Sequence, residues 1–277
     1  MSSFPRLLTG GTIVTQNKNR DVFVGDILIQ KNKIVKIAKE ITPPHNADII
    51  DAKNQFVIPG LIQAHTHLCQ ALFRGHADDL PLLDWLKNKI WPFEKNHNEN
   101  SIQASARIGL YEMQRLGTTT ILDMATVQHT DSLFEEVIRS KIRYFGGKCL
   151  MDFKKYSGPL YEDIDTTLKD LESQISKWHQ KNDLIDYVIS PRFAISCTDS
   201  LLKECSALQK THDLLIHTHA SESKDEVALI KKRTGYNNID YLAHLGLLNS
   251  KTIIVHGVHV TRTELKKMIQ ANAKLVH

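Results

Sequence analysis

The stretch from Phe56 to His67, with the sequence FVIPGLIQAHTH, decides the fold. It starts with a short apolar run, breaks at Pro59-Gly60, and continues as a strand-like run that ends in His65-Thr66-His67. Side chains two positions apart on a strand point to the same face, so we expect both imidazoles on one side of this strand. Two histidines placed in this way can bind one metal ion, and a surface or hydrogen-bonded pair is the plain alternative.

Beyond Pro59 the chain alternates between strand-like runs and longer segments of helical periodicity. One helix is predicted from Ile102 to Leu116, because apolar residues recur there at three- and four-residue steps and Gly117 then provides a stop. Such alternation is typical of successive βα units around a parallel sheet. The strand-like runs lie near residues 61–67, 118–124, 143–152, 187–196, 214–220 and 252–258, and a seventh begins near Lys274.

This pattern predicts an α/β fold, a (β/α)8 TIM-type barrel that is incomplete, with about seven strands. A complete barrel takes about 250 residues, so one that begins near residue 59 would end beyond about residue 300. The chain ends at His277. Residues 1–58 contain short β-rich runs at 22–30, 34–38 and 55–58 and are predicted to form the N-terminal part of a small β-sandwich. We therefore expect two domains, 1–58 and a barrel at 59–277 that lacks its C-terminal end.

The composition excludes several classes of function. The chain of 277 residues has 35 basic and 31 acidic side chains and a net charge of +4, which is too balanced for a nucleic-acid-binding surface. No run approaches the roughly 18 to 20 apolar residues that a membrane span needs. Four scattered cysteines are typical of reduced thiols in a cytoplasmic protein, so a metal site would have to be built from histidine.

Further histidines end two later strand-like runs. His217 and His219 repeat the His-x-His spacing, and Glu222 follows His219 by three residues. His256 ends the next run. Because the carboxyl ends of barrel strands meet at one rim, we expect these side chains to face one another there. Glu222 could then carry a proton and His256 could polarise a water molecule, whereas a packed, hydrogen-bonded core histidine is the alternative at each histidine position.

Three motifs together resemble those of the amidohydrolase superfamily, within its triazine hydrolase and adenosine-type deaminase branch. They are the FVIPGLIQAHTH stretch, the segment LFRGHADDL at residues 72–80, and the segment from Trp85-Leu86 to Trp91-Pro92-Phe93-Glu94. The runs from His217 to Glu222 and from His256 to His259 follow in the order of the family. The resemblance therefore covers the whole chain.

This resemblance implies a metal-dependent hydrolase on a barrel, with a β-sandwich built from both ends of the chain. It implies that His65, His67 and His219 bind one divalent metal ion, zinc in preference to iron. Glu222 would be the proton shuttle and His256 the assisting histidine. The remaining ligand of the family is an aspartate at the end of strand eight. We expect this chain to end before that position, inside a family motif.

Two residues bear on the substrate. Glu94 stands where nucleoside-deaminating relatives bind the ribose hydroxyls, and the alternative is a solvated carboxylate at a helix end. Arg192 stands where guanine deaminase-like relatives also have arginine, which can donate a planar fork to a purine acceptor. A surface arginine is the alternative there. Glu94 therefore favours a purine nucleoside as the substrate, whereas Arg192 favours a guanine-type base.

The resulting hypothesis is hydrolytic deamination of an amino-purine or a purine nucleoside, which is a small heterocyclic substrate. Two alternatives stay open. A triazine-type chlorohydrolase would use the same addition to displace chloride, and a fragment without the C-terminal aspartate would be catalytically incomplete. We expect a homo-oligomer or pairing with a complementary chain, because open barrel edges leave backbone groups unpaired. Neither a nucleic acid nor a membrane is expected as a partner.

Overall fold

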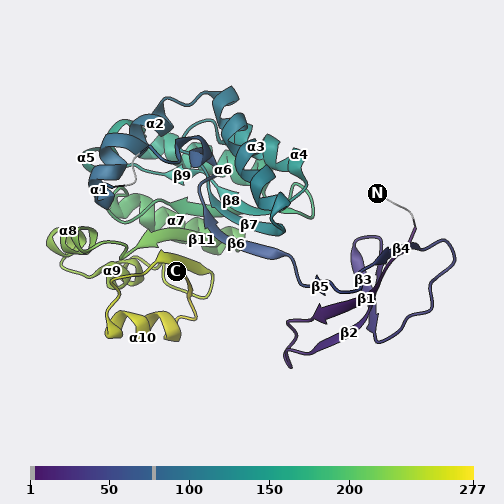
Figure 1. Ribbon diagram of the computed structural model, residues 1–277. Helices are drawn as coiled ribbons and strands as arrows, with labels where there is room; N and C mark the ends of the chain where they lie inside the picture. The colour runs from purple at the N-terminus through teal and green to yellow at the C-terminus, as the bar shows by residue number, and fades with distance from the viewer. Residues whose placement is uncertain (1–3, 77–78) are drawn as a thin grey trace. The chain divides into compact units, whose positions relative to one another are not determined.

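The computed structural model describes residues 4–76 and 79–277 and contains two compact units, 1–61 and 62–277 (Figure 1). Each unit has a sheet of its own. The boundary expected between residues 58 and 59 stays a prediction of domain organisation. Two residues of the 72–80 motif, Ala77 and Asp78, lie outside the described residues.

The first unit is a five-stranded sheet. Its strands are β1 (Arg6–Val14), β2 (Val22–Gln30), β3 (Lys33–Ala38), β4 (Asp48–Asp51) and β5 (Phe56–Val57). β2 pairs antiparallel with β1 and β3, whereas β4 and β5 run parallel to β1. The expected strands at 22–30, 34–38 and 55–58 correspond to β2, β3 and β5, but β1 and β4 were not predicted.

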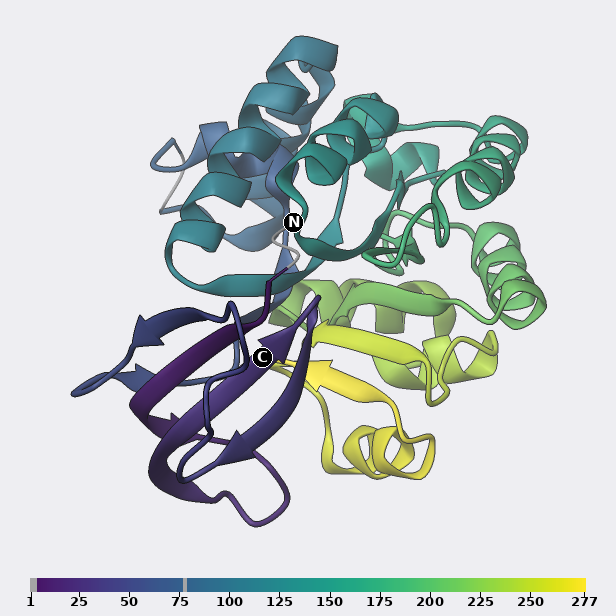
Figure 2. The ribbon, with the colours of Figure 1, turned by 90° about the vertical axis from the view of Figure 1, so that its right-hand side faces the viewer.

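The second unit is built on a row of parallel strands. They are β6 (Leu61–Thr66), β7 (Thr118–Met124), β8 (Arg143–Gly147), β10 (Ile185–Pro191), β11 (Leu215–Ala220), β12 (Thr252–His256) and β13 (Lys274–Val276), and the short β9 (Cys149–Leu150) pairs with β10. Neighbours from β7 to β13 pair in parallel. The order β13-β12-β11-β10-β8-β7-β6 confirms the predicted incomplete barrel (Figure 2).

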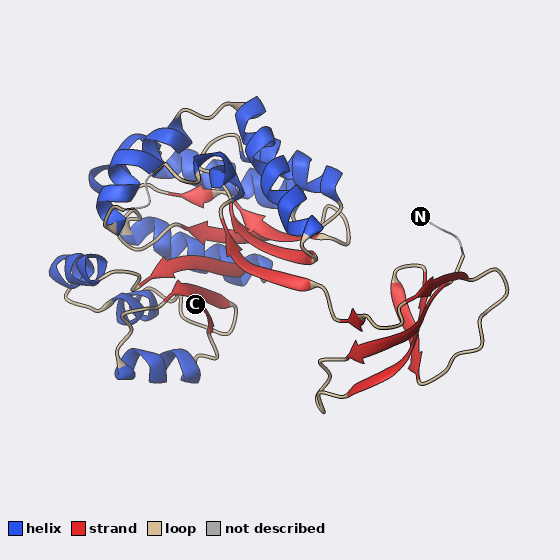
Figure 3. Ribbon diagram, in the orientation of Figure 1, coloured by secondary structure: helices blue, strands red, loops and turns tan. Residues whose placement is uncertain are grey.

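Helices alternate with these strands, as the sequence predicted (Figure 3). The α-helices are α1 (Leu82–Trp85), α2 (Trp91–Lys95), α3 (Glu99–Arg115), α4 (Thr130–Ser140), α5 (Lys154–Ser157), α6 (Ile164–Trp178), α7 (Asp199–His212), α8 (Lys224–Thr234), α9 (Asn238–His244) and α10 (Arg262–Gln270). The remaining helical segments are the 3₁₀ helices η1 (Leu68–Phe73) and η3 (Gly158–Leu160) and the π-helix η2 (Leu86–Ile90). Within the described residues, no helix combines the length and the apolar character that crossing a bilayer requires.

The helix predicted before strand β7 is confirmed as α3. Its apolar face contributes Ile102, Ala106 and Leu110 to the core. Gly117 follows the helix at φ +89°, a left-handed conformation that glycine adopts without steric cost, and its N–H donates to the carbonyl of Gln114. The chain thereby leaves the helix and enters β7 within one turn.

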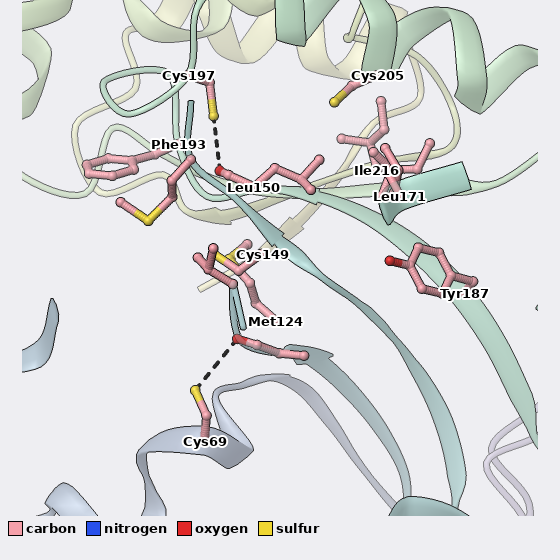
Figure 4. Close-up of a cluster of buried hydrophobic side chains, with 14 of the residues drawn as sticks. Cys69, Met124, Cys149, Leu150, Leu171, Tyr187, Phe193, Cys197, Cys205 and Ile216 are labelled. Atoms are coloured by element: carbon pink, nitrogen blue, oxygen red, sulfur yellow. Dashed lines mark hydrogen bonds between the residues drawn. The ribbon is translucent and has the colours of Figure 1, made fainter. Parts of the chain in front are cut away.

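The core of the second unit lies between the strands and the helices. The strands bury Ile121, Tyr144, Ile189, Ile216 and Ile254, one residue from each of β7, β8, β10, β11 and β12. The four cysteines are free and buried in this unit (Figure 4). Cys197 donates its thiol hydrogen to the carbonyl of Leu150 at 3.3 Å, and burial raises the pKa of the Cys197 thiol. The sequence-based expectation of reduced, unpaired thiols agrees with this arrangement.

Replacing the N-cap of α3 tests the energetic basis of this helix. The side chain of Asn98 accepts a hydrogen bond from the N–H of Ser101 at 3.0 Å, and the Ser101 hydroxyl accepts one from the N–H of Asn98. Asn98→Ala should lower the free energy of unfolding by about 1 kcal/mol, because the backbone N–H of Ser101 loses the side-chain oxygen that accepts its hydrogen bond. Urea unfolding measures this change. The control Asn100→Ala lies in the first turn without a capping role, and an equal loss in both variants would contradict the capping argument.

Candidate functional site

Five histidines meet at the carboxyl ends of the strands and are called here the histidine cluster. They are His65 and His67 from the end of β6, His217 and His219 from β11, and His256 from the end of β12. The ring centroid of His65 lies 4.9 to 5.5 Å from the centroids of the other four rings. The structure therefore brings together both His-x-His pairs and the later histidine that the sequence singled out.

Backbone carbonyls orient two of these rings. The Nδ1 of His67 lies 3.0 Å from the carbonyl oxygen of Met124, and the Nδ1 of His219 lies 2.7 Å from that of Arg192. A carbonyl oxygen can only accept, so each Nδ1 carries the hydrogen and each neutral ring keeps a lone pair on Nε2. The two Nε2 atoms face each other at 3.2 Å. They cannot hydrogen-bond to each other, since neither has a hydrogen to donate.

This spacing is that of two ligands of one metal ion. Zinc–nitrogen bonds of about 2.0–2.1 Å in a tetrahedral site place two ligand nitrogens about 3.3 Å apart. Burial lowers the pKa of both His67 and His219 well below the ordinary value, so both rings stay neutral and both lone pairs stay available. The donor set therefore suits a divalent cation.

A group of three possible ligand atoms extends this arrangement. One ring nitrogen each of His65, His219 and His256 lie within 4.8 Å of one another, which is a spacing that can hold a metal ion. Burial, with His256 and Arg192 nearby, lowers the pKa of His65 to about 4, so His65 is neutral as well. His256 adopts φ +70°, a left-handed backbone conformation that is uncommon for a residue with a side chain. This group shares His65 and His219 with the predicted ligands and has His256 in place of His67.

Glu222 lies beside His256 at the same rim. Its Oε1 is 3.5 Å from the Nε2 of His256, and its side chain is partly buried. Burial and the nearby carboxylate of Glu226 raise the pKa of Glu222 to about 7. A carboxylate with a pKa near neutrality can both accept and release a proton.

Sequence reasoning missed the residue that holds the Glu222 loop in place. The buried carboxylate of Glu226, at the start of α8, accepts hydrogen bonds from the N–H groups of Ser221 at 3.1 Å and Glu222 at 2.7 Å. Glu226 also forms a capping box with Ser223. The Ser-x-x-Glu spacing at residues 223–226 was the signal that could have found it.

Glu94 and Arg192 form a buried ion pair with each other. The Arg192 guanidinium donates to both carboxylate oxygens of Glu94, at 2.8 and 3.1 Å, and both residues are at most 3% exposed. Burial by itself lowers the pKa of Arg192, but the Glu94 carboxylate outweighs it and raises that pKa. The alternatives of a solvated helix-end carboxylate at Glu94 and a surface arginine at Arg192 are therefore wrong.

Gln70 completes this polar group, and the sequence analysis did not include it. Its Nε2 donates to the Oε1 of Glu94 at 2.7 Å. The position of Gln70, three residues after His67, was the available signal, because the η1 turn that follows β6 keeps it close to the histidines.

A cavity of about 160 Å³ joins the two groups. Its walls combine members of the histidine cluster with Glu222, Arg192 and Gln70, and with the apolar side chains of Leu82, Trp85, Leu86 and Phe193. A lining of apolar side chains with a few polar groups is typical of sites for small organic molecules. The arrangement can therefore hold a heterocycle next to the histidine cluster.

Asp123 anchors the segment that follows His67. Its buried carboxylate accepts hydrogen bonds from the N–H of Leu68 and from the hydroxyl of Tyr144, both at 2.8 Å. Burial raises the pKa of Asp123 to about 7. Asp123 thereby connects the end of β7 to the start of η1 and to β8.

Known proteins with similar sequences match nearly the whole chain. The chain is 35% identical over 274 residues to 5'-deoxyadenosine deaminase from Methanococcus aeolicus, and the match covers 96% of the chain and 62% of the deaminase. The chain thus spans about 62% of the length of this curated relative.

Solved structures share the fold. Guanine deaminase from C. acetobutylicum, with bound guanine, superposes with a TM-score of 0.91 at 27% identity, and 99% of the chain matches 67% of that protein. Atrazine chlorohydrolase from Arthrobacter aurescens, complexed with zinc, superposes with a TM-score of 0.88 over 98% of the chain and 65% of that protein. At 21% identity, the second likeness shows the fold alone.

The profile of the amidohydrolase family matches residues 56–277. This range contains the histidine cluster, Glu222 and the pair of Glu94 and Arg192. The sequence-based resemblance is confirmed, and the chain belongs to the amidohydrolase family.

Proposed function

We propose that this chain contains the metal centre and the substrate-binding wall of a hydrolase that deaminates an amino-purine or a purine nucleoside. The observation that carries the proposal is the pair of Nε2 lone pairs of His67 and His219, which face each other at 3.2 Å. His65 is the proposed third ligand. We propose one divalent ion, zinc in preference to iron, because neutral imidazoles at tetrahedral spacing suit zinc.

The residues of the chain would each have a distinct part in the reaction. A bound divalent ion would supply a Lewis acid that makes water nucleophilic near neutral pH. Glu222, with its pKa near 7, takes a proton from the attacking water and delivers it to the departing amino nitrogen. Water then contributes oxygen to the ring carbon, and ammonia leaves. His256, 3.5 Å from the carboxylate, holds Glu222 at the rim.

The proposed substrate-recognition element, called here the polar wall, consists of Arg192 and Gln70, which line the cavity, and of Glu94, to which both donate hydrogen bonds. Taken alone, Glu94 favours a purine nucleoside as substrate and Arg192 favours a guanine-type base. Because the two side chains form one ion pair with fixed geometry, they act as one unit, and the two indications no longer conflict. A carboxylate offers about four lone-pair sites, so Glu94 retains acceptor capacity for a substrate hydroxyl beside its three bonds. The deaminase named above acts on a deoxyadenosine and the guanine deaminase binds guanine, which supports a purine substrate.

The proposal extends to the location and the assembly of the protein. The buried free thiols support a reducing, cytoplasmic location. The strands β6 and β13 are the end strands of the described sheet, which supports a homo-oligomer or pairing with a complementary chain.

Metal analysis of histidine variants tests the ligand set. Chain purified without chelators should contain about one zinc ion, and His67→Ala and His219→Ala should each lower this content strongly, because each removes one of the two facing lone pairs. His256→Ala should keep most of the metal if His256 assists rather than binds. The control His45→Ala removes an exposed histidine of the first unit. Loss in His256→Ala with retention in His67→Ala would replace the ligand set by His65, His219 and His256.

Removal of the Glu222 carboxylate tests the proton transfer. Glu222→Gln should lower kcat of the active protein by about 10²- to 10⁴-fold while its metal content stays unchanged, because the amide cannot carry the proton. The matched control Asp225→Asn alters an exposed carboxylate three residues along the chain. Steady-state ammonia release measures kcat, and an unchanged value in Glu222→Gln would assign the proton transfer to another group.

A comparison of substrates tests the polar wall. Glu94→Gln should raise KM for a purine nucleoside by about 10-fold or more relative to the free base, since a hydrogen bond to a charged group contributes about 1.5–3 kcal/mol. The control Glu112→Gln alters a surface carboxylate that also pairs with an arginine, Arg74. Ammonia or chloride release is measured across adenine and guanine nucleosides, their bases and a chlorotriazine. Turnover of the chlorotriazine alone would refute the proposed substrate class.

A further inference from the structure

The ring of His217 has an unusual environment for a buried polar group. The residue is fully buried on β11, and its Nε2 lies 2.9 Å from the Nδ1 of His65. Among the described residues, the Nδ1 of His217 has no hydrogen-bond partner. Most buried polar atoms in proteins have a partner, so an unpaired ring nitrogen here needs a physical reason.

The partner of His65 differs in kind from those of the other two proposed ligands. His67 and His219 donate their Nδ1 hydrogens to backbone carbonyls, which are acceptors under all conditions. His65 meets an imidazole instead, and an imidazole nitrogen can either donate or accept. The hydrogen bond between His65 and His217 can therefore run in either direction, with either ring as the donor.

The first direction leaves His65 able to bind a metal. If the Nδ1 of His65 donates to the Nε2 of His217, the lone pair of His65 lies on its own Nε2. The hydrogen of neutral His217 then lies on its Nδ1, the atom that has no acceptor among the described residues. An unpaired buried donor costs about 1–3 kcal/mol, so this direction requires a compensating interaction.

The second direction blocks His65 as a ligand through Nε2. If the Nε2 of His217 donates to the Nδ1 of His65, the hydrogen of neutral His65 lies on its Nε2. The ring then presents a donor to the site in place of a lone pair. His217 is left with an unpaired acceptor, which is a less rare defect in proteins than an unpaired N–H.

We propose that His217 is a positioning residue that accepts the Nδ1 hydrogen of His65 when a divalent ion is bound, and that it thereby directs the Nε2 lone pair of His65 at the ion. This inference rests on the metal site of the proposed function. Binding of the ion supplies the interaction that offsets the unpaired N–H of His217. Metal affinity and the tautomers of His65 and His217 are therefore coupled, and His217 itself is not a ligand.

Zinc affinity of three variants tests the proposal. The metal-free 277-residue chain is titrated with zinc against a chromophoric chelator. His217→Leu, which cannot accept a hydrogen bond, should weaken zinc binding by about 10- to 100-fold, the usual effect of removing the partner of a metal-bound histidine. His217→Gln offers an amide oxygen as acceptor and should recover most of this loss. The control His179→Leu removes a histidine that accepts from the N–H of Tyr187, outside the cluster.

Tautomer assignment provides a readout that a merely structural role would not change. In zinc-loaded chain with ¹⁵N-labelled histidine, long-range ¹H–¹⁵N correlation should find the hydrogen of His65 on Nδ1 and that of His217 also on Nδ1. In the metal-free chain, the hydrogen of His65 should move to Nε2. A hydrogen on Nε2 of His65 in the zinc-loaded chain would overturn the proposal.

The outcomes separate this inference from the proposed function. Zinc binding that is equal in wild type, His217→Leu and His217→Gln would overturn the role of His217 and leave the metal site intact. Equal, severe losses in both His217 variants would make His217 a ligand and overturn its positioning role. Absence of zinc binding in the wild-type chain would overturn the proposed metal site, and the inference with it. Melting temperatures of the metal-free variants identify any loss that comes from unfolding.

Discussion

Two ring nitrogens that face each other with no hydrogen between them are the main constraint on this site. The carbonyls of Met124 and Arg192 hold the Nδ1 hydrogens of His67 and His219, and the two lone pairs meet at 3.2 Å. Two lone pairs at this distance repel each other unless a cation lies between them. The carbonyls come from β7 and from the end of β10, not from the strands that carry the histidines, so the parallel register of four strands sets the spacing.

Arg192 connects this centre to the proposed polar wall. Its backbone carbonyl orients His219, while its guanidinium holds Glu94 in a buried, bidentate pair. A single residue therefore contacts both His219 and Glu94. Breaking a buried ion pair by removing one partner leaves an uncompensated charge, which costs about 3–5 kcal/mol. We therefore expect that loss of the Glu94 carboxylate disturbs Arg192 and, through its backbone carbonyl, the orientation of His219.

The sequence predicted the elements whose pattern is local and missed those that depend on distant contacts. The strand at 118–124, α3 and both His-x-His pairs follow from periodicity and spacing along the chain. β1 was missed because Gly10-Gly11 and a β-bulge interrupt its alternation. The pairing of Glu94 with Arg192 joins residues 98 positions apart, and nothing in either local pattern indicates it. The meeting of His65 and His217 at the rim was expected from the order of the strands, but their hydrogen bond at 2.9 Å depends on the curvature of the strand row and could not be predicted from the spacing of the residues.

The left-handed backbone at the ends of two strands affects which substitutions this protein can accept during evolution. Ser221 at φ +56° and His256 at φ +70° end neighbouring strands in a conformation that glycine adopts freely and other residues adopt at a cost. Substitution of His256 by glycine would relieve this strain and remove the imidazole at once. Selection for thermal stability alone would therefore favour the loss of chemistry at this rim, and stabilised variants of the chain should be sought away from it.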